Sequence, residues 1–518
     1  MRSGNRFFAI LIIVMLAAGY AFSQPAPLTG FDEYAEKAMQ DWKVPGMAIA
    51  IVKDDKIVFA KGYGVRKAGE STPVDANTLF AIGSSSKAFT AAALAILVDE
   101  GKLKWDDRVT KYLPEFETYD PYVTRELTVR DLLTHRSGLE RGDQVWYGTE
   151  NDREEILRRV RFIKPTWSLR SHFGYQNLMY LAAGQVVAKV SGMTWDKFIA
   201  DRIFAPLGMT SSNTSITEFR NGGNVSTPHS LVDDKIVAIP WRNIDNIAPA
   251  GSINSSANEV AQWVRLQLGS GTFEGKKVFS PAVAKEMHTS QTVIRLDPPM
   301  GMRYPGAHFL NYGLGWFLSD YKGRKVVEHG GAIDGMRAEV ALVPEEKLGI
   351  VVLTNLGGSE VSMPLMYRVI DAYTGSPQKD WSGEMLGSYK KLMGMAEAAQ
   401  KKADAERVMG TTPSHDLKSY AGTYNNDLYG DVEIADTDGK LGIRFGPAFV
   451  GSMEHWHYDT FRATFDGAGG AKAQVSFGLD VKGKVETMTI NMPGLTAYPF
   501  KRVPEPPKTA AGASAVKN

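Results

Sequence analysis

The sequence predicts an α/β (α+β) protein with a larger domain, in which helices flank an antiparallel sheet, followed by a small all-β domain. Strand patterns occur at residues 47–60 and return at 325–353, after a mostly helical segment. Strands at both ends of a helical segment favour one antiparallel sheet that the helices cover. Short alternating runs between residues 431 and 490 predict the second domain.

The elements of the larger domain follow from hydrophobic spacing and from turn residues. Two apolar runs on either side of Lys53-Asp-Asp-Lys56 indicate a β-hairpin near the start. Helical spacing predicts a helix after Ser84 and further helices at 128–133, 152–162, 178–191 and 257–268. Strands are expected again at 325–328, 337–343 and 348–353. Together these elements place the larger domain at residues 28–375.

The texture of the chain changes after this domain. Residues 376–410 are rich in Lys, Ala, Glu and Met, which is typical of a helical linker. Residues 411–503 contain short alternating runs at 431–434, 441–445, 461–465, 473–477 and 485–490, separated by Asp/Gly turns. Regular short strands of this kind predict a small β-barrel or sandwich. The Pro-, Ala- and Lys-rich tail, 504–518, is expected to be disordered.

The N-terminus has the pattern of a cleaved signal peptide over residues 1–23. Arg2 and Arg6 precede a short apolar core, and Ala21-Phe-Ser23 is a small-x-small cleavage site. The apolar run is shorter than the ~20 residues that span a bilayer, and no later segment is apolar enough to span one. We therefore expect a periplasmic or secreted protein without a membrane span in its mature form.

Composition excludes several classes of function. The net charge of +1 gives no reason to expect a nucleic acid as partner. The chain has no cysteine, which rules out disulfides, cysteine-based metal sites and cysteine nucleophiles. The expected partners are a small-molecule or short-peptide substrate and, in a possible homo-oligomer, further copies of the chain.

The segment Gly83-Ser84-Ser85-Ser86-Lys87 carries the strongest chemical signal. Ser84 and Lys87, at i and i+3, share one face at the start of a helix. The helix dipole there favours charge on the serine oxygen, and a desolvated lysine loses its proton and acts as a base. The alternative is a helix-capping serine beside a solvated lysine. Ser-x-x-Lys also occurs at Ser319, Ser376, Ser388 and Ser514, but only Ser84 has an apolar helix behind it and a glycine turn before it.

Two further motifs complement this pair. Tyr175 near a lysine and a serine can be held partly as phenolate and relay a proton. The amide of Asn177 can bind a substrate carbonyl and hold the lysine. The alternative is a core aromatic followed by a helix cap. In His329-Gly330-Gly331, placed just after a strand, the glycines let the backbone approach a ligand. The alternative there is a Gly-Gly turn with an exposed histidine.

In order and spacing, Ser84-x-x-Lys87, Tyr175-x-Asn177 and His329-Gly-Gly331 resemble the three active-site motifs of penicillin-recognising serine hydrolases. The branch that the chain resembles most holds class C β-lactamases, penicillin-binding proteins, D-aminopeptidases and family VIII esterases. Segments 133–139, 248–253 and 312–316 look like family sequence. Residues 423–503 resemble the lipocalin-like barrel often fused after such hydrolases.

The resemblance implies a role for each motif residue. Ser84 would be the nucleophile that forms an acyl-enzyme, and Lys87 and Tyr175 the general base and acid. Asn177 and the segment His329-Gly330-Gly331 would bind substrate. The backbone N–H groups of Ser84 and Ala332 would form the oxyanion hole. No cofactor and no metal are needed.

One departure from the β-lactamase pattern narrows the expected substrates. His329 stands where Lys-Thr-Gly is common, and a histidine with a pKa of ~6.5 carries little fixed charge near pH 7. We therefore expect ester, amide or short-peptide substrates, including D-residue peptides, with weak β-lactam turnover at best.

Three other interpretations compete with the hydrolase. A non-catalytic sensor of wall peptides or penicilloyl-like ligands is the alternative function. An α/β-hydrolase is disfavoured because Gly-x-Ser-x-Gly is absent. His455 and His457 alternate with Trp456 as on a strand and lack further ligands for zinc.

Overall fold

The computed structural model describes residues 26–220, 222–466, 470–492 and 495–504. The expected signal peptide and almost all of the expected tail lie outside these residues. Within them the larger domain is built on an eight-stranded antiparallel sheet in the order β2-β1-β14-β13-β12-β11-β10-β9. Its strands are β1 Gly46–Lys53, β2 Lys56–Gly64, β9 Thr292–Ile294, β10 Leu310–Tyr312, β11 Phe317–Tyr321, β12 Arg324–Ile333, β13 Met336–Val343 and β14 Leu348–Thr354. N- and C-terminal strands pair at β1 and β14, as the sequence predicts, with Ala50 opposite Val351.

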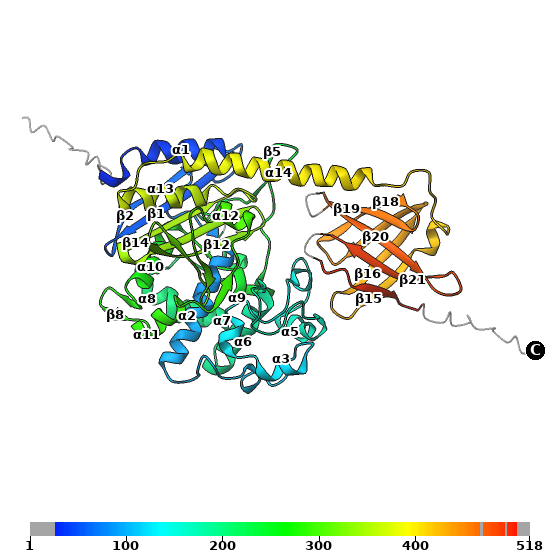
Figure 1. Cartoon of the computed structure of the whole chain (residues 1–518), viewed down its shortest axis with the longest axis horizontal. Helices are drawn as coiled ribbons and strands as arrows, with labels where there is room; N and C mark the ends of the chain where they lie inside the picture. The colour runs from blue at the N-terminus through cyan, green and yellow to red at the C-terminus, as the bar shows by residue number, and fades with distance from the viewer. Residues whose placement is uncertain (1–25, 221, 467–469, 493–494, 505–518) are drawn as a thin grey trace, which may run out of the picture.

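The helices lie on both faces of this sheet. They are α1 Phe31–Asp41, α2 Ser86–Asp99, α3 Pro121–Glu126, α4 Val129–Leu132, α5 Arg153–Arg159, α6 Asn177–Ser191, α7 Trp195–Ile199, α8 Ala205–Leu207, α9 Ala248–Gly251, α10 Ala257–Leu268, α11 Pro281–Met287, α12 Pro298–Arg303, α13 Ser362–Thr374 and α14 Trp381–Ala405. Figure 1 shows α1, α13 and the start of α14 on one side of the sheet. Short strand pairs join β3 Phe80–Ala81 to β6 Asn254–Ser255, β4 His229–Val232 to β5 Lys235–Ala238, and β7 Thr272–Phe273 to β8 Lys276–Lys277.

Strand β1 shows why this sheet is buried on both faces. Its even-numbered residues, such as Ala48 and Ala50, pack into the core on the side of α2 and α10. Its odd-numbered residues, such as Ile49 and Ile51, pack into a second core against α1 and α13. A strand with two buried faces reads as a continuous apolar run, and this is the pattern in the sequence.

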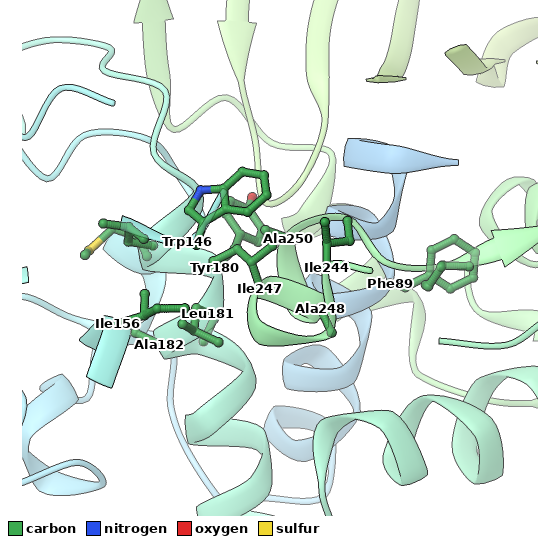
Figure 2. Packing of buried hydrophobic residues seen from close by; sticks show 14 of the residues in the cluster. Phe89, Trp146, Ile156, Tyr180, Leu181, Ala182, Ile244, Ile247, Ala248 and Ala250 are labelled. Carbon is green, nitrogen blue, oxygen red and sulfur yellow. The ribbon is translucent and has the colours of Figure 1, made fainter. Parts of the chain in front are cut away.

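The helical region is packed around α2 and α6, whose side chains are almost all buried. Segment α9 crosses between them, and a Cβ on Gly184 of α6 would lie 2.2 Å from the ring of Pro249. Only a glycine allows so close a crossing. Figure 2 shows Trp146, Tyr180 and Leu181 on one side of this crossing and Phe89 on the other. The crossing fixes the position of the α9 backbone next to α2.

The second domain is a closed antiparallel barrel of strands β15 to β22. The strands are β15 Gly422–Asn426, β16 Gly430–Thr437, β17 Lys440–Phe445, β18 Phe449–His457, β19 Thr460–Phe465, β20 Ala471–Leu479, β21 Val485–Asn491 and β22 Pro499–Arg502. Alternate residues are buried, and aromatic rings such as Phe461 and Phe477 contact one another inside. Closure gives every strand two neighbours and leaves no open edge.

Helix α14 connects the two domains, and Figure 1 shows the barrel at its far end, beside the region of α5. Among the described residues three hydrogen bonds join the barrel to the larger domain, and one of them runs from the Lys164 N–H to Tyr498 Oη at 3.1 Å. Arg159 Nη1 donates to the Leu428 carbonyl at 3.0 Å, and Thr496 Oγ1 donates to Glu140 Oε1 at 2.9 Å. No helix among the described residues is long and apolar enough to cross a membrane.

The structure corrects three details of the sequence reading. His329, Gly330 and Gly331 do not follow a strand but lie inside β12, because β13 pairs with them without a break. Aromatic residues around glycine predict a strand at 312–316, but the glycines of this segment form the turn between β10 and β11. The barrel also contains β15, β18 and β22, whose patterns are interrupted by glycine and polar residues.

Candidate active site

Ser84 lies in a tight turn that leads into α2. The turn, Gly83–Ser85, is a short 3-10 helix, and Gly83 has a φ of 51°. A Cβ on Gly83 would lie 2.6 Å from the backbone nitrogen of Ala332 in β12, so a side chain has no room there. Ser85 Oγ donates to the His329 carbonyl at 2.8 Å. These contacts fix the start of α2 against β12 and place Ser84 between them.

Lys87 is completely buried beside this serine. Its Nζ lies 3.0 Å from Ser84 Oγ and donates to the Ala250 carbonyl of α9 at 2.7 Å. The Tyr175 and Tyr180 ring centroids lie 4.9 Å and 5.3 Å from the same nitrogen. Burial, and secondly the charge of Arg141, hold the pKa of Lys87 well below its usual value. The geometry supplies a neutral amine in hydrogen-bonding distance of a hydroxyl.

Tyr175 is the third member of this group. Its phenol hydrogen-bonds Ser84, and the Arg141 guanidinium lies 5.0 Å from the centre of its ring. The sequence reading expected nearby cations to hold Tyr175 partly as phenolate. The structure indicates the opposite, because burial raises its pKa and outweighs the effects of the Ser84 bond and of Arg141. Tyr175 therefore stays a neutral phenol that can donate a proton.

Asn177 is the first residue of α6, and its contacts differ from those expected. Its Nδ2 donates to Asp143 Oδ1 at 2.8 Å, whereas the bonds of Lys87 go to Ser84 and Ala250. Asn177 is not the cap of the helix either, since Gln176 accepts from the Leu178 N–H. The asparagine thus orients Asp143 rather than the lysine.

His329 projects from β12 toward the face of the sheet on which Tyr175 lies. Its side chain is almost completely buried. Its Nε2 lies 2.9 Å from Tyr312 Oη, and its Nδ1 lies 2.6 Å from the Gly330 carbonyl. This pattern fits a neutral ring that donates from Nδ1 and accepts at Nε2. Burial lowers the pKa of His329 to about 3. Both ring nitrogens thus make hydrogen bonds within the protein. His329 can bind a substrate only if one of these two hydrogen bonds breaks.

Gly331 brings β12 and the Ser84 turn into contact. A Cβ at this position would lie 1.8 Å from the Ile82 carbonyl oxygen and 3.1 Å from the Ser84 nitrogen. Only glycine fits here. The backbone N–H groups of Ser84 and Ala332 consequently belong to two segments in direct contact, which is the arrangement that an oxyanion hole needs.

A cleft of about 300 Å³ opens above these groups. It is lined by Ser84, Tyr175, His329, Gly330, Gly331 and Ala332, together with Arg141, Arg303, Arg337, Glu339 and Glu360 among others. Lys87 lies buried behind the serine, and Asn177 is not among the lining residues. A carbonyl that enters the cleft would meet a hydroxyl, a phenol and two backbone donors.

Sequence reasoning missed several residues of this site. Arg141 Nε bonds Asp143 at 2.7 Å, and Asp143 also accepts from Trp146 Nε1 and from Asn177. The ring centres of His135 and Tyr175 lie 4.1 Å apart, and His135 Nδ1 accepts a hydrogen bond from the Gln176 N–H. His135 belongs to segment 133–139, which looks like family sequence, but no spacing rule links this segment to Tyr175.

The fold and this arrangement of serine, lysine and tyrosine define a serine hydrolase of the β-lactamase type. Residues 31–374 match the Beta-lactamase family, and residues 406–502 match a domain of unknown function, DUF3471. The chain therefore belongs to the β-lactamase family and is a β-lactamase-related serine hydrolase.

Relatives support the same class. The chain is 30% identical over 488 residues to the unguisins hydrolase ungD of Aspergillus violaceofuscus, covering 85% of this chain and 83% of that protein. It is 25% identical over 362 residues to the protein flp of Staphylococcus aureus strain COL, with 69% of each chain covered. The structure of an octameric penicillin-binding protein homologue from Pyrococcus abyssi superposes with a TM-score of 0.60 at 23% identity, covering 92% of this chain and all of that one. This last likeness concerns the fold alone.

Proposed function

We propose that the protein cleaves ester or amide bonds, including those of short or D-residue peptides, through an acyl-enzyme on Ser84. The observation that carries the proposal is the buried Lys87 amine 3.0 Å from Ser84 Oγ. A nucleophile within hydrogen-bonding distance of a neutral base is the minimum for acyl transfer.

The proposed reaction has two steps, acylation and deacylation, and one proton passes between the side chains of the site in each step. Ser84 Oγ bonds to the substrate carbonyl carbon while Lys87 Nζ takes the serine proton, and the N–H groups of Ser84 and Ala332 stabilise the oxyanion. Tyr175 gives its proton to the leaving group as the C–O or C–N bond breaks, and regains one from Lys87. Water then attacks the acyl carbon by the same route, which releases the acid and restores Ser84.

The neutral His329 supports a preference for ester, amide and peptide substrates over β-lactams. A neutral His329, with both nitrogens engaged, offers no fixed positive charge to a substrate carboxylate at that position. We therefore propose ester, amide or short-peptide substrates with weak β-lactam turnover. We also propose export to the periplasm or medium after removal of residues 1–23, and assembly into a homo-oligomer. Edman sequencing of the mature protein and light scattering test these two points.

The decisive experiment is intact mass after incubation of the purified protein with a fluorophosphonate probe. The wild type should gain one adduct, and Ser84→Ala should gain none. Ser319→Ala, which alters another Ser-x-x-Lys serine, is the matched control and should be labelled like the wild type. Substrate profiling with p-nitrophenyl esters, D-aminoacyl amides and nitrocefin then ranks the substrate classes.

The absence of any adduct, combined with no turnover, would contradict the hydrolase. It would instead favour a non-catalytic sensor of wall peptides or penicilloyl-like ligands. Labelling of Ser84→Ala at the wild-type level would show that the nucleophile is another residue.

A further inference from the structure

A second cavity, of about 450 Å³, lies beneath α14 and beside the cleft. Its walls come from α12, α13, α14 and the end of α1. The apolar residues that line it are Trp42, Met302, Met363, Met385, Tyr389, Leu392 and Met393. We call this cavity the distal groove.

The distal groove adjoins the catalytic cleft. Arg303, Arg337 and Glu360 line both cavities. Glu360 accepts from Arg303 at 2.8 Å and pairs with Arg337 at 3.2 Å, and Arg303 also lies 3.5 Å from Glu339. The two cavities therefore meet at a polar neck of paired charges, beyond which the lining becomes apolar.

The lining of the distal groove is both apolar and open to solvent. Met302 and Met393 are each 44% exposed, and Leu392 is 40% exposed. Contiguous exposed apolar surface of this kind marks a binding site more often than an ordinary surface. Methionine side chains are flexible and polarizable, so they adapt to apolar groups of different shape.

We propose that the distal groove binds an apolar alkyl or aryl group that the substrate carries several bonds away from its scissile carbonyl. This inference rests on the proposed hydrolase function and names its substrate class. The polar neck would meet the polar atoms that join the two parts of the substrate. The three residues that line both cavities place the distal groove next to the cleft of Ser84, which favours a substrate over a second copy of the chain as the occupant.

Chain-length series on the full-length protein test the inference. One series holds p-nitrophenol as the leaving group and lengthens the acyl chain from acetyl to decanoyl. The other holds the acetyl group and lengthens the alcohol, with acid release followed by pH-stat. Because each buried methylene contributes about 0.8 kcal/mol, kcat/KM should rise up to roughly fourfold per added methylene in one of the two series.

Met393→Glu places a charge in the distal groove, and Met395→Glu is the matched control. Met395 lies on the same helix, is 62% exposed and does not line the groove. Met393→Glu should lose at least about tenfold in kcat/KM on the longest substrates, because a carboxylate in an apolar site must be desolvated, and should keep the wild-type rate on p-nitrophenyl acetate. Met395→Glu should keep the whole profile. Leu392→Gln serves as a second groove variant.

Two results would overturn the inference while leaving the hydrolase intact. One is acetyl turnover with no dependence on length in either series. The other is an unchanged length profile in Met393→Glu with a lower mass by light scattering, which would make the groove a subunit interface. Failure to hydrolyse every ester, p-nitrophenyl acetate included, without labelling of Ser84, contradicts the function and the inference together.

Discussion

Around Ser84, burial decides the protonation state of the titratable side chains. Lys87 and His329 have pKa values below their usual ranges, and Tyr175 has a raised one, in each case with burial as the largest cause. Burial therefore favours the neutral form of all three side chains. The site thus has a free amine as base and an intact phenol as acid, which are the two forms that the proposed proton transfers need.

The buried lysine predicts a pH dependence of catalysis. Only the neutral amine accepts the Ser84 proton, so kcat/KM for p-nitrophenyl acetate should rise with pH through the lowered pKa of Lys87. Lys87→Arg retains a cation but no base and should lose on the order of 1000-fold in kcat/KM. A pH–rate profile of both proteins checks this. A variant within threefold of the wild type would remove Lys87 from the mechanism.

The buried histidine predicts a pH dependence of stability. The unfolded imidazole binds a proton below about pH 6.5, whereas His329 in the folded protein does so only near its pKa of about 3. The unfolded state binds more protons in this window, so the free energy of unfolding falls as the pH falls from 6.5. Between about pH 7.5 and pH 5 this single group accounts for roughly 2 kcal/mol.

Urea unfolding of wild type and His329→Gln at these two pH values tests the effect. The drop in free energy of unfolding should be smaller in the variant by about that amount. An equal drop in both proteins would mean that His329 titrates normally in the folded state. His135, whose pKa burial also lowers, should contribute in the same direction.

At the scale of elements, the site depends on how closely α2 approaches β12. Gly83 lies in the Ser84 turn and faces β12, and Gly331 lies in β12 and faces the turn. Neither position has room for a side chain. Ser85 adds a hydrogen bond between the same two segments. The two proposed oxyanion donors, the N–H groups of Ser84 and Ala332, belong to different elements, so their separation is set by this packing rather than by either element alone.

Gly331→Ala should therefore impair catalysis strongly. The added methyl meets a backbone oxygen at 1.8 Å and must push β12 away from the Ser84 turn. A displacement of this kind costs on the order of 100-fold in kcat/KM. Gly387→Ala on α14, where a Cβ has no neighbour within 4 Å, is the control and should retain full activity. Wild-type kcat/KM in Gly331→Ala would show that the two backbone donors are not used together.

At the scale of the whole molecule, the barrel touches the segment that carries part of the site. The Glu140 side chain accepts from Thr496 of the barrel, and its carbonyl accepts from Gln176 Nε2 at 2.7 Å. Gln176 lies between Tyr175 and Asn177. The position of the barrel and the position of the candidate proton donor are thus linked through one residue.

Loss of two of the three hydrogen bonds between the domains should loosen the barrel. In the double variant Arg159→Ala/Thr496→Val each lost bond costs about 1 kcal/mol of docking free energy, and small-angle scattering should report a larger radius of gyration. Thr460→Val, which removes a bond within the barrel to Ser476, should leave the radius unchanged. An unchanged radius in the double variant would mean that α14 and the remaining contacts, among them the Lys164 N–H bond to Tyr498 Oη, hold the barrel.

The amino-acid sequence by itself determined the elements and the chemistry that the chain has available. Hydrophobic periodicity fixes the core strands and α10, whose predicted bounds are those of the structure. The order of the motifs at Ser84, Tyr175 and His329 indicates the family, because each motif is short and depends on a local turn or helix that the sequence itself specifies. It did not place His329 within β12, since a Gly-Gly pair reads as a break when its pairing partner, β13, is not known.

Only the tertiary structure decided which side chains are neutral and which partners they take. Burial, and hence pKa, depends on residues distant in sequence, as with the Ala250 carbonyl that binds Lys87. The same holds for Asn177, whose partner Asp143 precedes it by 34 residues, and for the distal groove, which α14 forms by folding back across the sheet. Contacts of this kind arise from packing between elements, and no local pattern in the chain records them.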